Sequence, residues 1–149
     1  MKRYESIVAN DVLQHFQDPR GKSLMNHVYN SYNIDAALAI AGLFCPEIVE
    51  VNGYIFISEF YNGGIDDLEQ QFKYDRKKIE MFVNSWSLAD LILNDSSIHC
   101  DELVDELGKV IKHFWELRFK SMFPERNIVV EIGDKIMGER GLTVTVYQA

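Results

Sequence analysis

The sequence predicts an α+β fold: an antiparallel sheet of about four strands, arranged as two hairpins, packs against several helices, one of them long and in the C-terminal half. Apolar residues recur three and four positions apart over residues 101–123, the spacing of one helix face sustained for about six turns. An Asn-Gly pair at positions 52 and 53 joins two β-rich runs. Residues 127–133 and 142–146 alternate apolar and polar side chains, as half-buried strands do.

The first third of the chain predicts three helices. Asn10 or Asp11 can cap a short helix that ends before Pro19, and a second helix follows the break at Gly21. Residues 34–44 form the third helix, which is apolar almost all round and rich in alanine. Because a helix that is hydrophobic on every side is usually buried, we expect residues 34–44 to lie inside the protein.

Residues 47–60 carry the clearest local pattern, that of a β-hairpin. Asn-Gly accepts positive φ at both central positions of a type I′ turn. In the second half of the hairpin, Ile55 and Ile57 fall on one face, and Tyr54, Phe56 and Phe60 fall on the other. Both faces are largely apolar, so we expect the hairpin to be covered on both sides or to expose one aromatic face for binding.

Two helices are expected after the hairpin. The chain first passes through a loop in which we expect Tyr61 to be exposed, and residues 65–72 then form a short acidic helix. Asp75 caps the next helix, whose apolar pattern continues to about residue 93. Residues 84–87 lie in the middle of this helix and are expected to kink it, because Ser and Asn compete for backbone hydrogen bonds.

The long helix at residues 101–123 has start and stop signals of its own. Ser96 or Ser97 can cap it, acidic residues occupy its first turn, and Pro124 ends it. No internal repeat or low-complexity linker interrupts the chain. We therefore expect a single domain, residues 1–149.

Composition places the chain among globular proteins, with 47% apolar and 26% charged residues. No run approaches the roughly 20 apolar residues that cross a bilayer, and no apolar block of signal-peptide length follows Met1. These features lead us to expect a cytoplasmic protein with no membrane contact. Two cysteines, Cys45 and Cys100, are too few for a disulfide framework, and we expect both to be reduced.

The net charge of −8 is concentrated in the middle of the chain. Residues 47–106 carry fourteen acidic and four basic side chains, whereas residues 1–46 are balanced and residues 107–149 have a small excess of basic side chains. Phosphate binding needs Lys and Arg on a surface, so this distribution argues against a nucleic-acid partner. It favours a basic protein partner instead.

No strong catalytic or metal-binding motif occurs. The sequence lacks an HExxH pattern, a Cys-x-x-Cys pair, a G-x-S-x-G elbow, a P-loop and a G-x-G-x-x-G loop. His99, Cys100, Asp101 and Glu102 are the densest set of potential ligands, which we interpret as a helix start with acids near its positive dipole end. His113 lies about three and a half turns beyond Cys100, too far for a Cys–His pair. We expect no catalytic residue, no metal and no cofactor.

Acidic and aromatic side chains lie close together in the sequence after the hairpin. Aromatic residues ringed by acids resemble an interface hot spot, although a packed core and a solvated acidic face are the simpler interpretations. If these residues have a role, we expect them to attract a basic partner, because that needs only exposure and a shared sign of charge. The residues expected to bind the partner are Glu59, Tyr61, Asp66, Asp67, Glu69, Asp101 and Glu102.

In general character the chain resembles the small acidic immunity proteins that bacteria carry against delivered toxins, including those of contact-dependent growth-inhibition systems. It shares their size, negative charge, lack of a signal sequence, lack of catalytic motifs and α+β layout. These families have no common motif, so no residue role is carried over. The resemblance implies a one-to-one complex that blocks the active site or substrate surface of a cognate toxin. Many such toxins are nucleases with basic grooves, which an acidic surface would complement.

Two other hypotheses remain open from the sequence. The chain could be a small-ligand-binding or enzymatic α+β domain with a pocket between sheet and helices, using dispersed carboxylates or His113. It could also form a homo-oligomer through the aromatic hairpin at residues 47–60.

Overall fold

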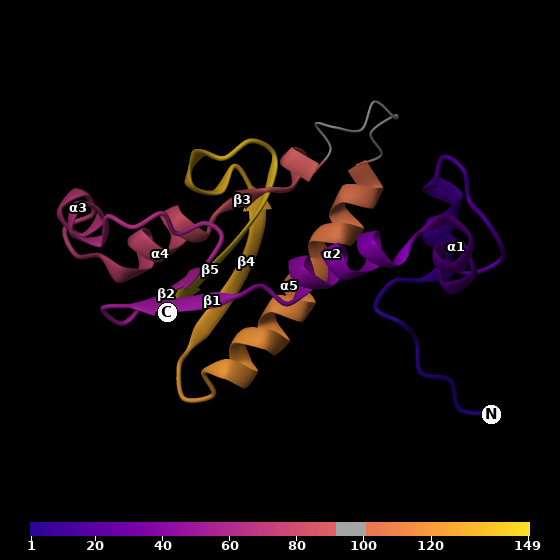
Figure 1. Ribbon diagram of the computed structural model, residues 1–149, viewed down its shortest axis with the longest axis horizontal. Helices are drawn as coiled ribbons and strands as arrows, with labels where there is room; N and C mark the ends of the chain where they lie inside the picture. Colours follow the sequence, from indigo (N-terminus) through magenta and orange to yellow (C-terminus); the bar gives the residue numbers. More distant parts are fainter. Residues whose placement is uncertain (92–100) are drawn as a thin grey trace.

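Figure 1 shows the computed structural model, which describes residues 1–91 and 101–149. The chain is α+β, with two antiparallel sheets and one long helix. The N-terminal part holds η1 (Asn10–His15), α1 (Leu24–Ser31) and α2 (Ile34–Phe44). The remaining elements are β1 (Ile48–Val51), β2 (Tyr54–Ile57), α3 (Ile65–Gln71), α4 (Arg76–Asn84), β3 (Trp86–Ser87), η2 (Leu88–Leu91), α5 (Asp101–Met122), β4 (Ile128–Asp134), η3 (Ile136–Gly138) and β5 (Leu142–Gln148).

The long helix α5 organises the main core, as its sequence pattern predicts. Ile111, Trp115 and Phe119 are spaced four residues apart, so they share one face of α5, and each is buried. They pack in one cluster with residues of β2, β4 and β5. Gly108 brings the helix close to the sheet, because a Cβ at this position would lie only 3.0 Å from Cδ1 of Ile132.

The expected hairpin is present and is covered on both sides. Val51 pairs with Tyr54, and Asn52 and Gly53 have φ values of 52° and 83°, as a type I′ turn requires. Ile55 and Ile57 join the main core, whereas Tyr54 and Phe56 pack in a second cluster with Ile79 of α4. Phe60 packs against the main core and not on the side of Tyr54 and Phe56, because the chain turns directly after Ile57. Of the two alternatives left open by the sequence, the buried hairpin is the one observed.

The prediction of one sheet of about four strands is wrong. β1 and β2 form a two-stranded sheet, and a separate three-stranded sheet has the order β3-β5-β4. β4 and β5 pair over their full length, from Ile128 with Gln148 to Asp134 with Leu142. The two sheets are not joined by strand pairing because side chains of α4 stand between β2 and β5.

Two fully buried polar residues of α4, Glu80 and Asn84, form this link between the sheets. The Asn84 side chain accepts a hydrogen bond from the backbone N–H of Ile57 at 2.9 Å and donates to the carbonyl oxygens of Ile55 and Val146, each at 2.9 Å. The Glu80 carboxyl group accepts from the backbone N–H groups of Ile55 and Gln148 at 2.8 and 2.6 Å. These bonds satisfy backbone groups that a neighbouring strand would otherwise bind.

The helix expected to continue from Asp75 to about residue 93 ends at Asn84. Ser85 has an extended backbone, and Trp86 and Ser87 pair with Val144 and Thr143 of β5. Strand pairing therefore replaces the predicted kink, since the apolar spacing of this segment fits both a helix and a strand over so short a run. The expected turn at 94–97, the Ser96 or Ser97 cap and the end of that helix lie outside the described residues.

The expectation that residues 34–44 are buried is also wrong. Helix α2 has no buried residue, and its Ile34 and Leu38 side chains are 74% and 67% exposed. The helix contacts the rest of the protein mainly through its C-terminal turn, where Phe44 stacks on Phe114 with ring centroids 5.2 Å apart. Figure 1 shows α1 and α2 extending away from the two sheets, so the sheets offer no cover for their outer sides.

Replacement of Glu80 by Gln tests the link between the sheets. Both carboxyl oxygens of Glu80 accept hydrogen bonds from N–H groups. In a Gln at this position the amide NH₂ would replace one of these oxygens, so in either orientation an N–H donor would face another N–H donor. We expect Glu80→Gln to lower the free energy of unfolding by about 2–4 kcal/mol, measured by urea denaturation. The exposed Glu125→Gln is the matched control and should change it by less than about 0.5 kcal/mol. Equal stability of the two variants would contradict the role assigned to Glu80.

Candidate functional site

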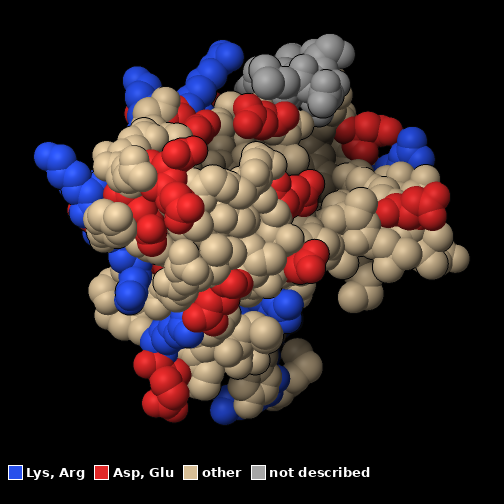
Figure 2. All heavy atoms as spheres, turned by 60° about the vertical axis from the view of Figure 1, so that its left-hand side comes forward, with Lys and Arg blue, Asp and Glu red and all other residues tan. Residues whose placement is uncertain are grey.

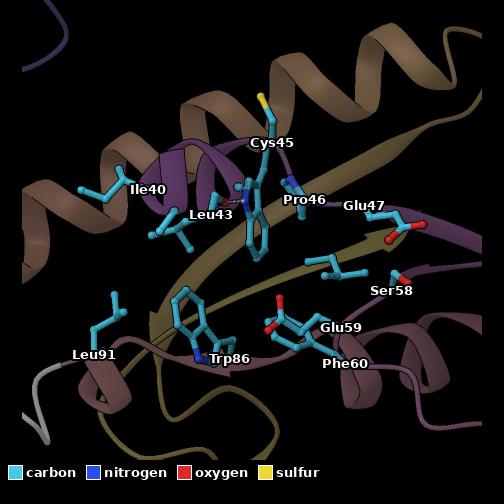
Figure 3. A pocket seen from close by; sticks show the side chains of 14 residues that line it. Ile40, Leu43, Cys45, Pro46, Glu47, Ser58, Glu59, Phe60, Trp86 and Leu91 are labelled. Carbon is cyan, nitrogen blue, oxygen red and sulfur yellow. Dashed lines mark hydrogen bonds between the residues drawn. The ribbon is translucent and has the colours of Figure 1, made fainter. Parts of the chain in front are cut away.

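A pocket of about 780 Å³ lies between α2, the end of β2, β3 with η2, and α5. Figure 3 shows Ile40 and Leu43 of α2 on one side, with Phe60 and Trp86 on the other. A volume of this size is in the range of pockets that hold small molecules or large side chains.

Aromatic rings form much of the pocket wall. Trp115 is 1% exposed, and its Nε1–H donates to the carbonyl oxygen of Leu43 at 3.0 Å, which fixes the indole between α5 and α2. Phe60 and Trp86 lie with ring centroids 6.0 Å apart and planes inclined by 40°. Pairing of Trp86 with Val144 holds this second indole in β3. The wall is therefore fixed by three separate elements.

The charges around the pocket all have one sign. Glu47 and Glu59 line it and are exposed, whereas none of the described lining residues is Lys, Arg or His. In Figure 3 the Glu59 carboxylate points into the hollow between Trp86 and Leu43, and Cys45 points away from it. The arrangement combines apolar aromatic walls with a negative mouth.

The seven residues predicted to bind a partner do not form one patch. Glu59 lines the pocket, whereas Asp66 and Asp67 stand exposed in the first turn of α3. Asp101 and Glu102 are exposed in the first turn of α5, which Figure 1 shows far from α3. The predicted residues thus fall on separate parts of the surface.

Two of the predicted residues are held by the hairpin. Tyr61, expected to be exposed, is half-buried because its ring stacks on Phe56 with centroids 4.7 Å apart. Glu69 is half-buried and accepts a hydrogen bond from the Tyr54 hydroxyl group. These contacts tie α3 and the loop before it to β2, and they leave Asp66 and Asp67 as the outward-facing acids of α3.

Acidic and basic side chains both lie on the face that includes α3 and α4: Asp66 and Asp67 are exposed on α3, and α4 exposes Arg76, Lys77 and Lys78. Figure 2 shows the acidic side chains spread across this face in several groups, with Lys and Arg side chains mainly around its margin. Within residues 1–91 and 101–149, Asp66 and Asp67 take part in no ion pair, so their charges are available to another molecule.

The pocket residues other than Glu59 were not identified from the sequence. Trp86 and Trp115 fit the apolar spacing of the two helices that the sequence predicts over residues 75–93 and 101–123, and this spacing accounts for them without a site. The chain has only two tryptophans, and both line the pocket. Their meeting depends on contacts between distant segments, which local periodicity does not show.

The alternative based on His113 receives little support from its surroundings. His113 is exposed, packs edge-on against Phe114, and lines a smaller hollow of about 480 Å³ with Glu116, Lys120 and Arg126. In the part of the chain that the structure describes, no group of three or more His, Cys, Asp or Glu side chains is placed to hold a metal ion. Cys100 and His99 lie outside that part.

No protein-family model, curated protein or solved structure matches this chain. Among the described residues, no helix is both long enough and apolar enough to cross a membrane.

The Tyr54–Glu69 contact predicts a pH dependence of stability. Burial, followed by the hydrogen bond to Glu69, raises the pKa of Tyr54 above its usual value of 10.0. Above pH 10 the unfolded chain therefore loses the Tyr54 proton before the folded chain does, and stability falls as pH rises. Urea midpoints between pH 8 and 11 should fall more steeply for the natural protein than for Tyr54→Phe. Tyr29→Phe, at a residue 87% exposed, should follow the natural protein; parallel curves for all three would contradict the assignment.

Proposed function

We propose that this chain is a binding protein of the immunity type, which neutralises a basic protein partner by covering its active site or substrate surface. The observation that carries the proposal is the one-signed surface at the pocket and on α3. Glu47 and Glu59 border an aromatic pocket that no described basic residue lines, and Asp66 and Asp67 of α3 are exposed and form no ion pair with any residue that the structure describes. Such a surface would attract a partner whose own groove is lined with Lys or Arg.

Electrostatic attraction would act before contact is made. Acidic side chains on one face raise the rate at which a basic protein approaches in a usable orientation, and salt weakens this effect. A nuclease-type toxin is a suitable partner, because a groove that binds phosphates has to be basic. The chain would then act in the cytoplasm, where its partner's substrate is found.

The second candidate is small-ligand binding in the pocket between α2 and the hairpin. Its volume and its two tryptophans favour this function over a purely flat contact surface. The ionisable groups among the described lining residues are Glu47, Glu59 and the outward-pointing Cys45. These groups favour binding of a ligand over acid–base catalysis as the role of this candidate.

Association kinetics with the product of the gene next to this one test the proposal. We expect Asp66→Asn/Asp67→Asn to lower the association rate constant by roughly threefold or more at low salt, and to flatten its salt dependence, because the face loses two charges. Asp101→Asn/Glu102→Gln removes the same charge from the start of α5 and should have little effect. Surface plasmon resonance at several salt concentrations gives both quantities.

Two outcomes would contradict the proposal. If neither neighbouring gene product is toxic or binds the chain, the immunity assignment fails. If the α5 variant slows association and the α3 variant does not, the partner docks at the other acidic group.

A further inference from the structure

We propose that the pocket between α2 and the hairpin receives an organic cation, namely a Lys or Arg side chain of the protein partner. This inference rests on the proposed function and adds the anchoring contact to it. The walls are apolar and aromatic, and the ionisable groups that point at or border the hollow are the carboxylates of Glu59 and Glu47. No lining residue among those described would neutralise them from within.

The aromatic wall suits the stem and the charge of such a side chain. Lys and Arg bury their methylene stems against apolar surface and keep the charged group at a polar site. A guanidinium or ammonium group near the face of a tryptophan is attracted by the ring, and this attraction strengthens when water is excluded. Trp86 and Phe60 form one wall, and Glu59 lies next to Phe60 in the chain, so ring and carboxylate contacts are available to one ligand.

The charge of the pocket decides which class of ligand it takes. Among the described lining residues an anion would meet two carboxylates and no base, and it would lose its hydration without compensation. A neutral apolar group would fill the pocket and contact its walls, but it would make no favourable electrostatic contact with Glu59. A cation with an apolar stem uses both features, and a bidentate guanidinium group also matches the geometry of a carboxylate.

The proposed function favours a side chain on a protein over a free amine. Glu59 lines the pocket, whereas Asp66 and Asp67 are exposed on another part of the surface. A basic partner would therefore reach the pocket through its own Lys or Arg side chains, without needing the acids of α3 for this contact. Its anchoring side chain would then be buried between Trp86 and Leu43.

Tryptophan fluorescence of the full chain tests the pocket without the partner. Both tryptophans of the protein line it, so emission reports on this site alone. We expect n-butylguanidinium to cause a saturable change, and the neutral analogue n-butylurea to bind at least about fivefold more weakly. Glu59→Gln should weaken n-butylguanidinium binding by a similar factor, whereas Glu125→Gln should not. Equal binding of the two probes, or no response to either, would overturn the cation site.

Competition with the partner separates this inference from the proposed function. If the pocket is the anchor, n-butylguanidinium competes with the partner, and Glu59→Gln speeds dissociation of the complex. If the partner binds but neither effect occurs, the anchor is elsewhere and the inference fails while the function stands. If the probe binds but no protein partner does, the pocket serves a free amine, and the proposed function fails instead.

Discussion

The rest of the structure depends on the hydrogen bonds that Glu80 and Asn84 make to two different sheets. These residues are one helical turn apart on α4, so a single helix face presents both to the gap between β2 and β5. The same bonds place the two sides of the pocket, because Asn84 holds Ile57 at the end of β2 and the chain reaches Trp86 two residues later. The spacing between Phe60 and Trp86 therefore follows from a buried polar contact far from the surface. In a low-dielectric interior such a network stabilises only when every member has a partner, which makes it specific for one arrangement of the sheets.

The pocket and the acidic helix α3 are supported by different core clusters. The hydrogen bonds of Glu80 and Asn84 fix the positions of these clusters relative to each other. The second core cluster, around Phe56 and Ile79, supports α3 and its outward acids. The main cluster, around Trp115, supports the aromatic wall. Glu59 and Phe60 lie in the segment that passes from one cluster to the other, directly after β2. The pocket lining thus combines a carboxylate and a ring because Glu59 and Phe60 lie where the two cores meet.

Local patterns predicted the elements that depend on local physics. The period of α5, the Asn-Gly turn and the alternation of β4 and β5 are each confirmed, because helix faces, positive φ and strand faces leave direct traces in the sequence. The division into two sheets was not predictable in this way. Glu80 and Asn84 are polar residues in a helix, and such residues are usually exposed to solvent, so the sequence gives no sign that they are buried between the sheets. Likewise, apolar composition placed α2 in the interior, although burial depends on what covers a helix and not on the helix alone. Glu59 was singled out for its charge, but the meeting of Trp86 with Trp115 required the tertiary fold.

Gly108 has a consequence for the shape of the space between α5 and the sheet. At this point the helix backbone approaches Leu88, Ile132 and Leu142 so closely that a methyl group would crowd all three. Two turns later the large indole of Trp115 fills the same layer between helix and strands. The side chains that α5 contributes to this layer therefore range from none at Gly108 to the largest ring at Trp115. The Trp115 Nε1–H donates to the carbonyl oxygen of Leu43, at the C-terminal end of α2. The bulky end of the layer is thus also the end at which the otherwise peripheral helix α2 is attached.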